Sequence, residues 1–112
     1  MIPYIVLPFL VLIIDLPWLA VTSHYSKTMI RTIQKSELNV RFIPAAVVYI
    51  ALAYLVTLPK NVNNAFLLGV STYAVYDFTN YATLNDYSLE FALLDSLWGG
   101  ILFVILHLII KE

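Results

Sequence analysis

The sequence predicts an all-α protein, a four-transmembrane-helix bundle with a short amphipathic interfacial helix after the first span. Composition is the first reason, because 62% of the 112 residues are hydrophobic and only 12% are charged, against about 25% charged in soluble domains. A soluble chain of this length could not bury so much apolar surface. The second reason is that four apolar segments approach the roughly 20 residues that a membrane-spanning helix needs. We therefore expect one integral membrane domain over residues 1–112.

The first span is expected at residues 2–24, and it lacks the basic region and small-residue cleavage site of a signal peptide. The connection that follows has apolar residues at helical spacing on one side and basic residues on the other: Met29, Ile30 and Ile33 against Lys27, Arg31 and Lys35. This pattern predicts a short amphipathic helix lying at the level of the lipid headgroups. A solvated polar loop is the alternative.

The remaining spans are expected at residues 42–58, 64–84 and 89–110. Pro59 should stop the second helix, because proline cannot continue a helix. Ser88 precedes the fourth span and is a suitable N-cap. Short turns therefore join the second, third and fourth helices.

The basic residues predict the orientation in the membrane. Four lie in the first connection, and two lysines lie on the opposite side of the predicted bundle: Lys27, Arg31, Lys35 and Arg41 against Lys60 and Lys111. Basic connections favour the cytoplasmic side. We therefore expect a multi-pass protein with a cytoplasmic first connection and non-cytoplasmic termini.

Three carboxylates lie within the predicted spans, namely Asp15, Asp77 and Asp95. Such residues are costly near the bilayer centre, so they usually face a bundle interior and mark function. Counting about 1.5 Å per residue from the helix ends places all three roughly 10–14 Å from the same membrane face. The same distance along the second helix reaches Tyr49. The sequence thus predicts one polar layer to which all four helices contribute.

The spacing of other polar residues supports this layer. Tyr73 and Asn80 lie on the same helical stripe as Asp77. The tetrapeptides DLPW and DSLW repeat an Asp-x-x-Trp pattern and place Trp18 and Trp98 one turn from an aspartate. A buried indole N–H needs an acceptor, and a carboxylate is a strong one. We therefore expect at least one hydrogen bond between an indole and a carboxylate.

Three carboxylates at close range cannot all be ionised without a cation. The layer must hold protons, a metal ion, an exchangeable cation or strongly donating hydrogen-bond partners, and the sequence does not choose among them. Three interpretations stay open: a buried network that only fixes helix packing, an ion or proton site, and an enzymatic or ligand-binding role. The modest strength of hydrogen bonds inside membranes leaves the packing interpretation as a serious one.

Several other function classes find no support. The chain has no cysteine, which excludes disulfides and thiolate chemistry. The net charge of −1 gives no basis for nucleic-acid binding. No glycine-rich phosphate loop or Gly-x-Ser-x-Gly motif is present. We expect no enzymatic activity and no cofactor, and we expect His24 and His107 at the membrane interfaces.

Three motifs carry a resemblance to a known family: DLPWL at residues 15–19, YDFTNYATL at residues 76–84 and DSLWG at residues 95–99. With these motifs the chain resembles the bacterial membrane-protein family catalogued as domain of unknown function 2177, over nearly its whole length. It departs from the family pattern in having Pro17 inside the first motif and a shorter turn between the second and third helices. The resemblance implies a four-helix membrane protein of unassigned activity.

As function we favour binding or translocation of a cation or protons at the layer. Its residues are the three aspartates, with support from the side chains of Trp18, Tyr49, Tyr73, Asn80 and Trp98. The alternative is a non-catalytic structural subunit of a larger membrane assembly, such as a multisubunit complex or a viral membrane layer. Four short helices bury little surface alone, so the expected partners are the lipid bilayer and either further copies of the chain or other membrane subunits.

Overall fold

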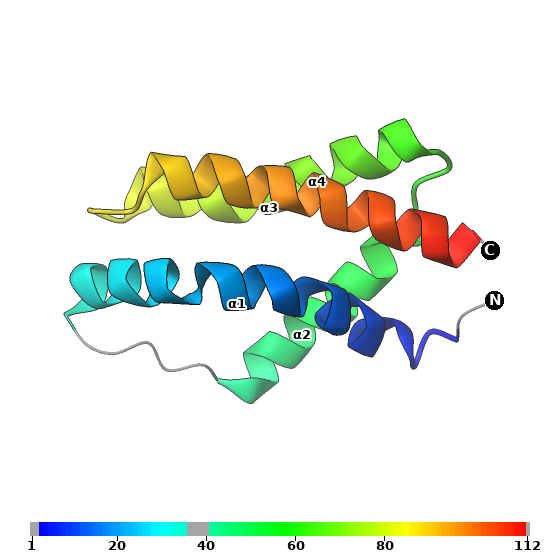
Figure 1. Cartoon of the computed structure of the whole chain (residues 1–112), viewed down its shortest axis with the longest axis horizontal. Coiled ribbons are helices and arrows are strands. Elements are labelled where there is room, and N and C mark those ends of the chain that lie inside the picture. Colours follow the sequence, from blue (N-terminus) through cyan, green and yellow to red (C-terminus); the bar gives the residue numbers. More distant parts are fainter. Residues whose placement is uncertain (1–2, 36–40, 112) are drawn as a thin grey trace.

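The structure is a computed structural model that describes residues 3–35 and 41–111. These residues form no strand and four helices, arranged along a body of 45 × 27 × 22 Å (Figure 1). The helices are α1 (Leu7–Gln34), α2 (Phe42–Leu55), α3 (Val62–Thr83) and α4 (Leu89–Lys111). The all-α prediction is confirmed. Three helices follow the long axis of the body, and α2 crosses them obliquely (Figure 1).

The prediction of a separate interfacial helix is wrong, because its residues belong to α1, which continues without a break to Gln34. No proline or glycine stands between His24 and Gln34 to stop the helix. The helix ends where Lys35 adopts a left-handed conformation with φ 63°, and the N–H of Lys35 donates to the carbonyl of Arg31 at 2.9 Å. The predicted first span and the predicted amphipathic helix are thus one element.

The extension of α1 packs on protein where we expected it to lie on lipid. Met29 is buried, and it forms a small second core with Tyr87 and Ala92 at the turn between α3 and α4. Tyr25 on the same extension donates a hydrogen bond to Ser88 Oγ at 2.6 Å. The apolar side of this segment therefore has a partner within the chain.

Helices α3 and α4 make the closest helix pair in the molecule. Gly69 and Gly99 bring their backbones together: a Cβ atom added at Gly99 would lie 2.6 Å from the carbonyl oxygen of Gly69 and would also strike the ring of Tyr73. Small residues such as Gly99 and Gly100 permit this close approach because they place no side chain between the helices. The main core lies between these two helices and the first two, and its largest fully buried side chains are Leu7, Val11, Val56, Leu102, Phe103 and Leu106.

Short-range signals explain the helix boundaries. Ser88 caps α4 as predicted, since its Oγ accepts the N–H of Phe91 at 3.1 Å. Asn61 caps α3 in the same way, and its side chain accepts the N–H of Asn64 at 2.8 Å. Helix α2 ends at Leu55, a few residues before Pro59 and short of the expected end of the span.

Among the described residues, α1 and α4 are long and apolar enough to cross a membrane. Helix α2 has 14 residues and a length of about 21 Å, which is less than the roughly 30 Å of a hydrocarbon core. Helix α3 has 22 residues but is less apolar than α1 and α4. Two of the four expected spans therefore meet both requirements.

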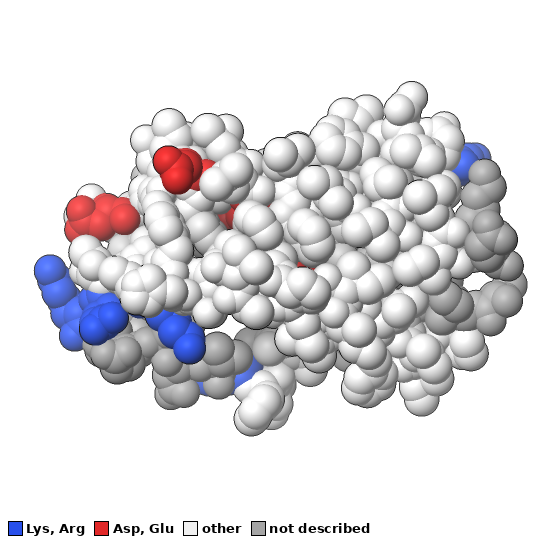
Figure 2. Space-filling model, viewed as in Figure 1, with Lys and Arg blue, Asp and Glu red and all other residues white. Residues whose placement is uncertain are grey.

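The charged side chains in view gather mainly at the end of the body formed by the end of α1 and the α3–α4 turn (Figure 2). Further basic atoms lie near the start of α2 and at the opposite end, and the surface between the two ends is mostly uncharged. One end carries the basic residues of α1 beside acidic residues of the α3–α4 region, and these exposed groups are Lys27, Arg31, Lys35, Asp86 and Glu90. Figure 1 places the start of α1, the end of α4 and the α2–α3 connection together at the other end.

Candidate functional site

The two Asp-x-x-Trp motifs pair with each other across α1 and α4. Trp98 Nε1–H donates to Asp15 Oδ1 at 2.7 Å, and Trp18 Nε1–H donates to Asp95 Oδ1 at 2.7 Å. The two indoles stack with ring centroids 5.5 Å apart and planes at 11°. Because the helices run antiparallel, the aspartate of each motif lies level with the tryptophan of the other. The predicted indole–carboxylate hydrogen bond is therefore present twice.

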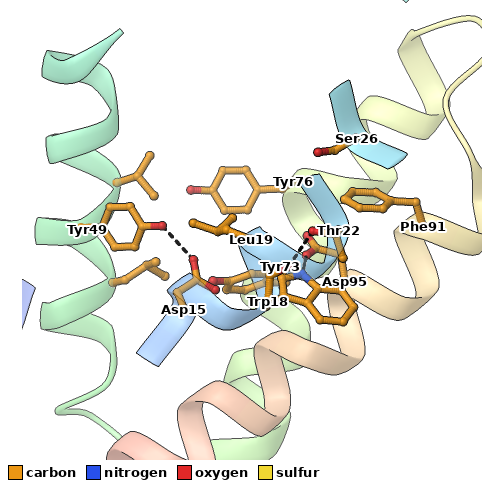
Figure 3. A pocket seen from close by; sticks show the side chains of 12 residues that line it. Asp15, Trp18, Leu19, Thr22, Ser26, Tyr49, Tyr73, Tyr76, Phe91 and Asp95 are labelled. Carbon is orange, nitrogen blue, oxygen red and sulfur yellow. Dashed lines mark hydrogen bonds between the residues drawn. The ribbon is translucent and has the colours of Figure 1, made fainter. Parts of the chain in front are cut away.

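Helix α2 completes the surroundings of Asp15. The hydroxyl of Tyr49 donates to Asp15 Oδ2 at 2.7 Å (Figure 3). Asp15 is buried, and each of its carboxylate oxygens accepts a short hydrogen bond from a neutral donor. Hydrogen bonds of this kind stabilise an ionised carboxylate away from water. The sequence predicted that Tyr49 lies at the same depth as the aspartates, and its contact with Asp15 agrees with that prediction.

Asp77 has a different environment from Asp15. It is 2% exposed, its Oδ1 accepts from the Tyr87 hydroxyl at 3.0 Å, and its Oδ2 has no hydrogen-bond partner among the described residues. The carboxyl of Asp95 lies beside it, close enough to interact directly. Two carboxylates in contact repel each other unless one of them holds a proton. A proton or a cation held between Asp77 and Asp95 would relieve this repulsion.

Tyr87 lies in the turn after α3 and is the last residue of the network that connects the three aspartates. Burial raises the pKa of its phenol, so the hydroxyl keeps its proton and remains a donor to Asp77. Asn80 lies beside the same hydroxyl. The three aspartates are thus connected through side chains that start at Tyr87 and end at Tyr49.

A pocket of about 280 Å³ opens beside this network (Figure 3). Two aspartates and a set of aromatic rings line it together with two hydroxyl side chains of α1, and all four helices contribute to its wall. The aspartates are Asp15 and Asp95, the rings are Trp18, Tyr49, Tyr73, Tyr76 and Phe91, and the hydroxyls are Thr22 and Ser26.

The structure divides the predicted residues into two groups. Those that line the pocket are Asp15, Trp18, Tyr49, Tyr73 and Asp95. Those that lie outside it are Asp77, Asn80 and Trp98, although each of them contacts or adjoins a member of the network. Among the described residues, no three His, Asp or Glu side chains are grouped so that they could hold a metal ion.

Sequence reasoning missed two tyrosines that matter to the site. Tyr76 lies one turn from Tyr73 and shares an edge-to-face contact with it, so helical spacing was an available signal. Tyr87 lies in the turn between α3 and α4 and reaches back to Asp77, and nothing local in the sequence indicates that contact.

His107 lies inside the bundle, and its expected position at a membrane interface stays a prediction. His107 is 7% exposed, and its Nε2 has no hydrogen-bond partner among the described residues. It lies one helical turn after Phe103 and therefore shares the inward face of α4. His24 is exposed.

The comparisons agree with the resemblance found in the sequence. A family model described as "Predicted membrane protein (DUF2177)" matches residues 1–109. No curated protein and no solved structure matches the chain.

Proposed function

We propose that this chain, which belongs to the DUF2177 family of predicted membrane proteins, crosses the membrane four times and binds or translocates a cation or protons. The site is the network of Asp15, Asp77 and Asp95. We propose no enzymatic activity and no cofactor. The observation that carries the proposal is the contact between Asp77 and Asp95.

A proton at this contact can be held by either of two carboxyls, that of Asp77 or that of Asp95. Asp77 Oδ2 has no donor among the described residues, and its neighbour is another carboxyl. A proton on either acid relieves the repulsion, and a bound cation near Asp95 would do the same. Asp95 also lines the pocket. A cation that enters the pocket would therefore change the charge beside the buried Asp77. This is the arrangement that a site for proton or cation exchange requires.

Four spans fit the shape and charge of the molecule. The long axis of 45 Å is comparable to the roughly 40–45 Å of a bilayer with its headgroups. Most of the surface between the two ends of the body is uncharged in Figure 2. Large apolar side chains are exposed along α1, α2 and α4, among them Phe9, Ile13, Val47, Ile50 and Leu93. We place the basic end of α1 in the cytoplasm.

The rival proposal is a structural subunit of a membrane assembly, and the hydrogen bonding of Asp15 favours it. Both oxygens of Asp15 are satisfied by Tyr49 and Trp98, as expected of a network that only fixes packing. Self-association or a membrane partner is part of either proposal, because the exposed apolar side chains leave room for further contacts.

A flux measurement separates the two proposals. The purified protein is reconstituted into lipid vesicles that contain a pH-sensitive dye, and a potassium diffusion potential drives cation or proton movement. The wild type should carry flux, and Asp77→Asn should not, because an amide cannot ionise. Asp86→Asn is the matched control, since Asp86 is exposed in the adjoining turn. Wild-type vesicles that behave like empty ones would support the structural subunit.

A further inference from the structure

We infer that the pocket beside Asp15 and Asp95 binds a small organic ammonium cation. This inference rests on the proposed cation site and specifies the class of cation. It follows from the walls of the pocket, from its acids and from its size.

The walls are built mainly from aromatic rings. Five of the twelve lining residues are aromatic, and they come from all four helices: Trp18, Tyr49, Tyr73, Tyr76 and Phe91. The face of an aromatic ring attracts a cation, and several rings around one site are the usual means of recognising alkylated ammonium groups. Figure 3 shows the rings of Tyr49, Tyr76 and Phe91 arranged around the space above Asp15 and Asp95.

Two acidic side chains form the floor of the pocket. Asp15 and Asp95 both line it, and their hydrogen bonds come from neutral indole and phenol groups, which leave the charge of a carboxylate in place. An organic cation would supply the positive charge that this pair of acids lacks. An anion would be repelled.

The size and lining disfavour the simpler cations. A proton on Asp77 or Asp95 needs no space, whereas this pocket has about 280 Å³, near the lower end of the roughly 300–1,000 Å³ of small-molecule sites. A desolvated inorganic cation needs several oxygen ligands around it, but most of this wall is carbon from rings and from Leu19, Val48 and Leu52. An ammonium group with apolar substituents matches a wall of this kind.

The pocket also has a polar side that leads toward the charged end. Thr22 and Ser26 lie one helical turn apart on α1, and both line the pocket beyond Trp18. Their hydroxyls donate to backbone carbonyls of α1, which leaves their oxygen lone pairs available to water or to a ligand N–H. A cation could therefore reach the acids from the end of the molecule that carries Lys27.

Intrinsic fluorescence can test the inference directly. The chain has two tryptophans, and Trp18 lines the pocket while Trp98 stacks on it. The protein in lipid nanodiscs is titrated with choline and with tetramethylammonium. The neutral isostere 3,3-dimethyl-1-butanol, sodium chloride and potassium chloride serve as comparisons at constant ionic strength. Both ammonium ions should change the emission saturably, and the three comparison solutes should not.

A pair of variants locates the binding. Tyr76→Leu removes a ring from the pocket and should raise the Kd for choline about 2- to 5-fold, as the loss of one partly exposed cation–π contact predicts. Tyr81→Leu is the matched control, because Tyr81 lies on the same helix, is 43% exposed against 44% for Tyr76, and does not line the pocket. It should leave the Kd unchanged, and circular dichroism checks that both variants are folded.

Three results would overturn the inference: equal binding of the neutral isostere, the same emission change with sodium or potassium, and no saturable change with choline. The vesicle assay shows whether such a result also contradicts the proposed function. If flux still depends on Asp77, the proposed function stands and only the class of cation is wrong. If wild-type flux is also absent, translocation of a cation or protons is wrong as well.

Discussion

Replacement of Asp77 by asparagine should leave the protein as stable as the wild type, whereas leucine should destabilise it. The asparagine carbonyl can accept from Tyr87 as Asp77 Oδ1 does, at 3.0 Å in the wild type. Its NH₂ group can donate to the neighbouring Asp95, which takes the place of the shared proton. Both contacts of the wild-type carboxyl therefore survive without any ionisable group at this position.

Leucine can make neither contact. It leaves the hydroxyl of the buried Tyr87 without its acceptor, and a stranded buried polar group costs about 1–3 kcal/mol. Hydrogen bonds inside membranes average about 0.6 kcal/mol, which favours the lower part of that range. We therefore expect Asp77→Leu to lower the free energy of unfolding by about 1–2 kcal/mol, and Asp77→Asn to lower it by much less.

Unfolding by sodium dodecyl sulfate in mixed micelles, followed by far-ultraviolet circular dichroism, measures these differences. Asp86→Asn is the control for the loss of one negative charge. Asp86 is exposed and has a φ of 66°, a conformation that asparagine tolerates. An asparagine variant as unstable as the leucine variant would refute the shared proton, because it would mean that the site requires the negative charge of Asp77.

Two further predictions concern packing and topology. Gly99→Ala should destabilise the protein by about 1–3 kcal/mol in the same assay, because the new methyl would press on the carbonyl of Gly69, while Ser71→Ala on the exposed face of α3 should change little. The cysteine-free chain also permits single-cysteine labelling: Lys27→Cys and Lys60→Cys should react with a membrane-impermeant maleimide from opposite sides, and labelling from one side would contradict four spans.

The sequence allowed much of the architecture to be predicted, because the signals were local. Apolar segments, a proline and a serine cap located the helices, and the repeated Asp-x-x-Trp spacing indicated the indole–carboxylate bonds. In each case the physical cause lies within a few residues of the feature that it explains.

The failures come from contacts between segments that are distant in sequence. The stretch after His24 has an amphipathic pattern, and such a pattern fits a lipid surface and a protein surface equally well. The burial of Met29 against Tyr87 decided between them, and these residues are far apart in the chain. The pocket was missed for the same reason, since it exists only where all four helices meet.

The same packing that holds the bundle together also explains where the pocket lies. Helices α3 and α4 touch through glycine backbones, so no space remains between them. Helices α1 and α4 have few close backbone approaches and meet through the stacked rings of Trp18 and Trp98. Large rings keep the two helices apart, and the two indole–carboxylate bonds hold them at that distance. The cross-paired motifs therefore do two things at once, because they join the halves of the molecule and keep open the space that the acids line.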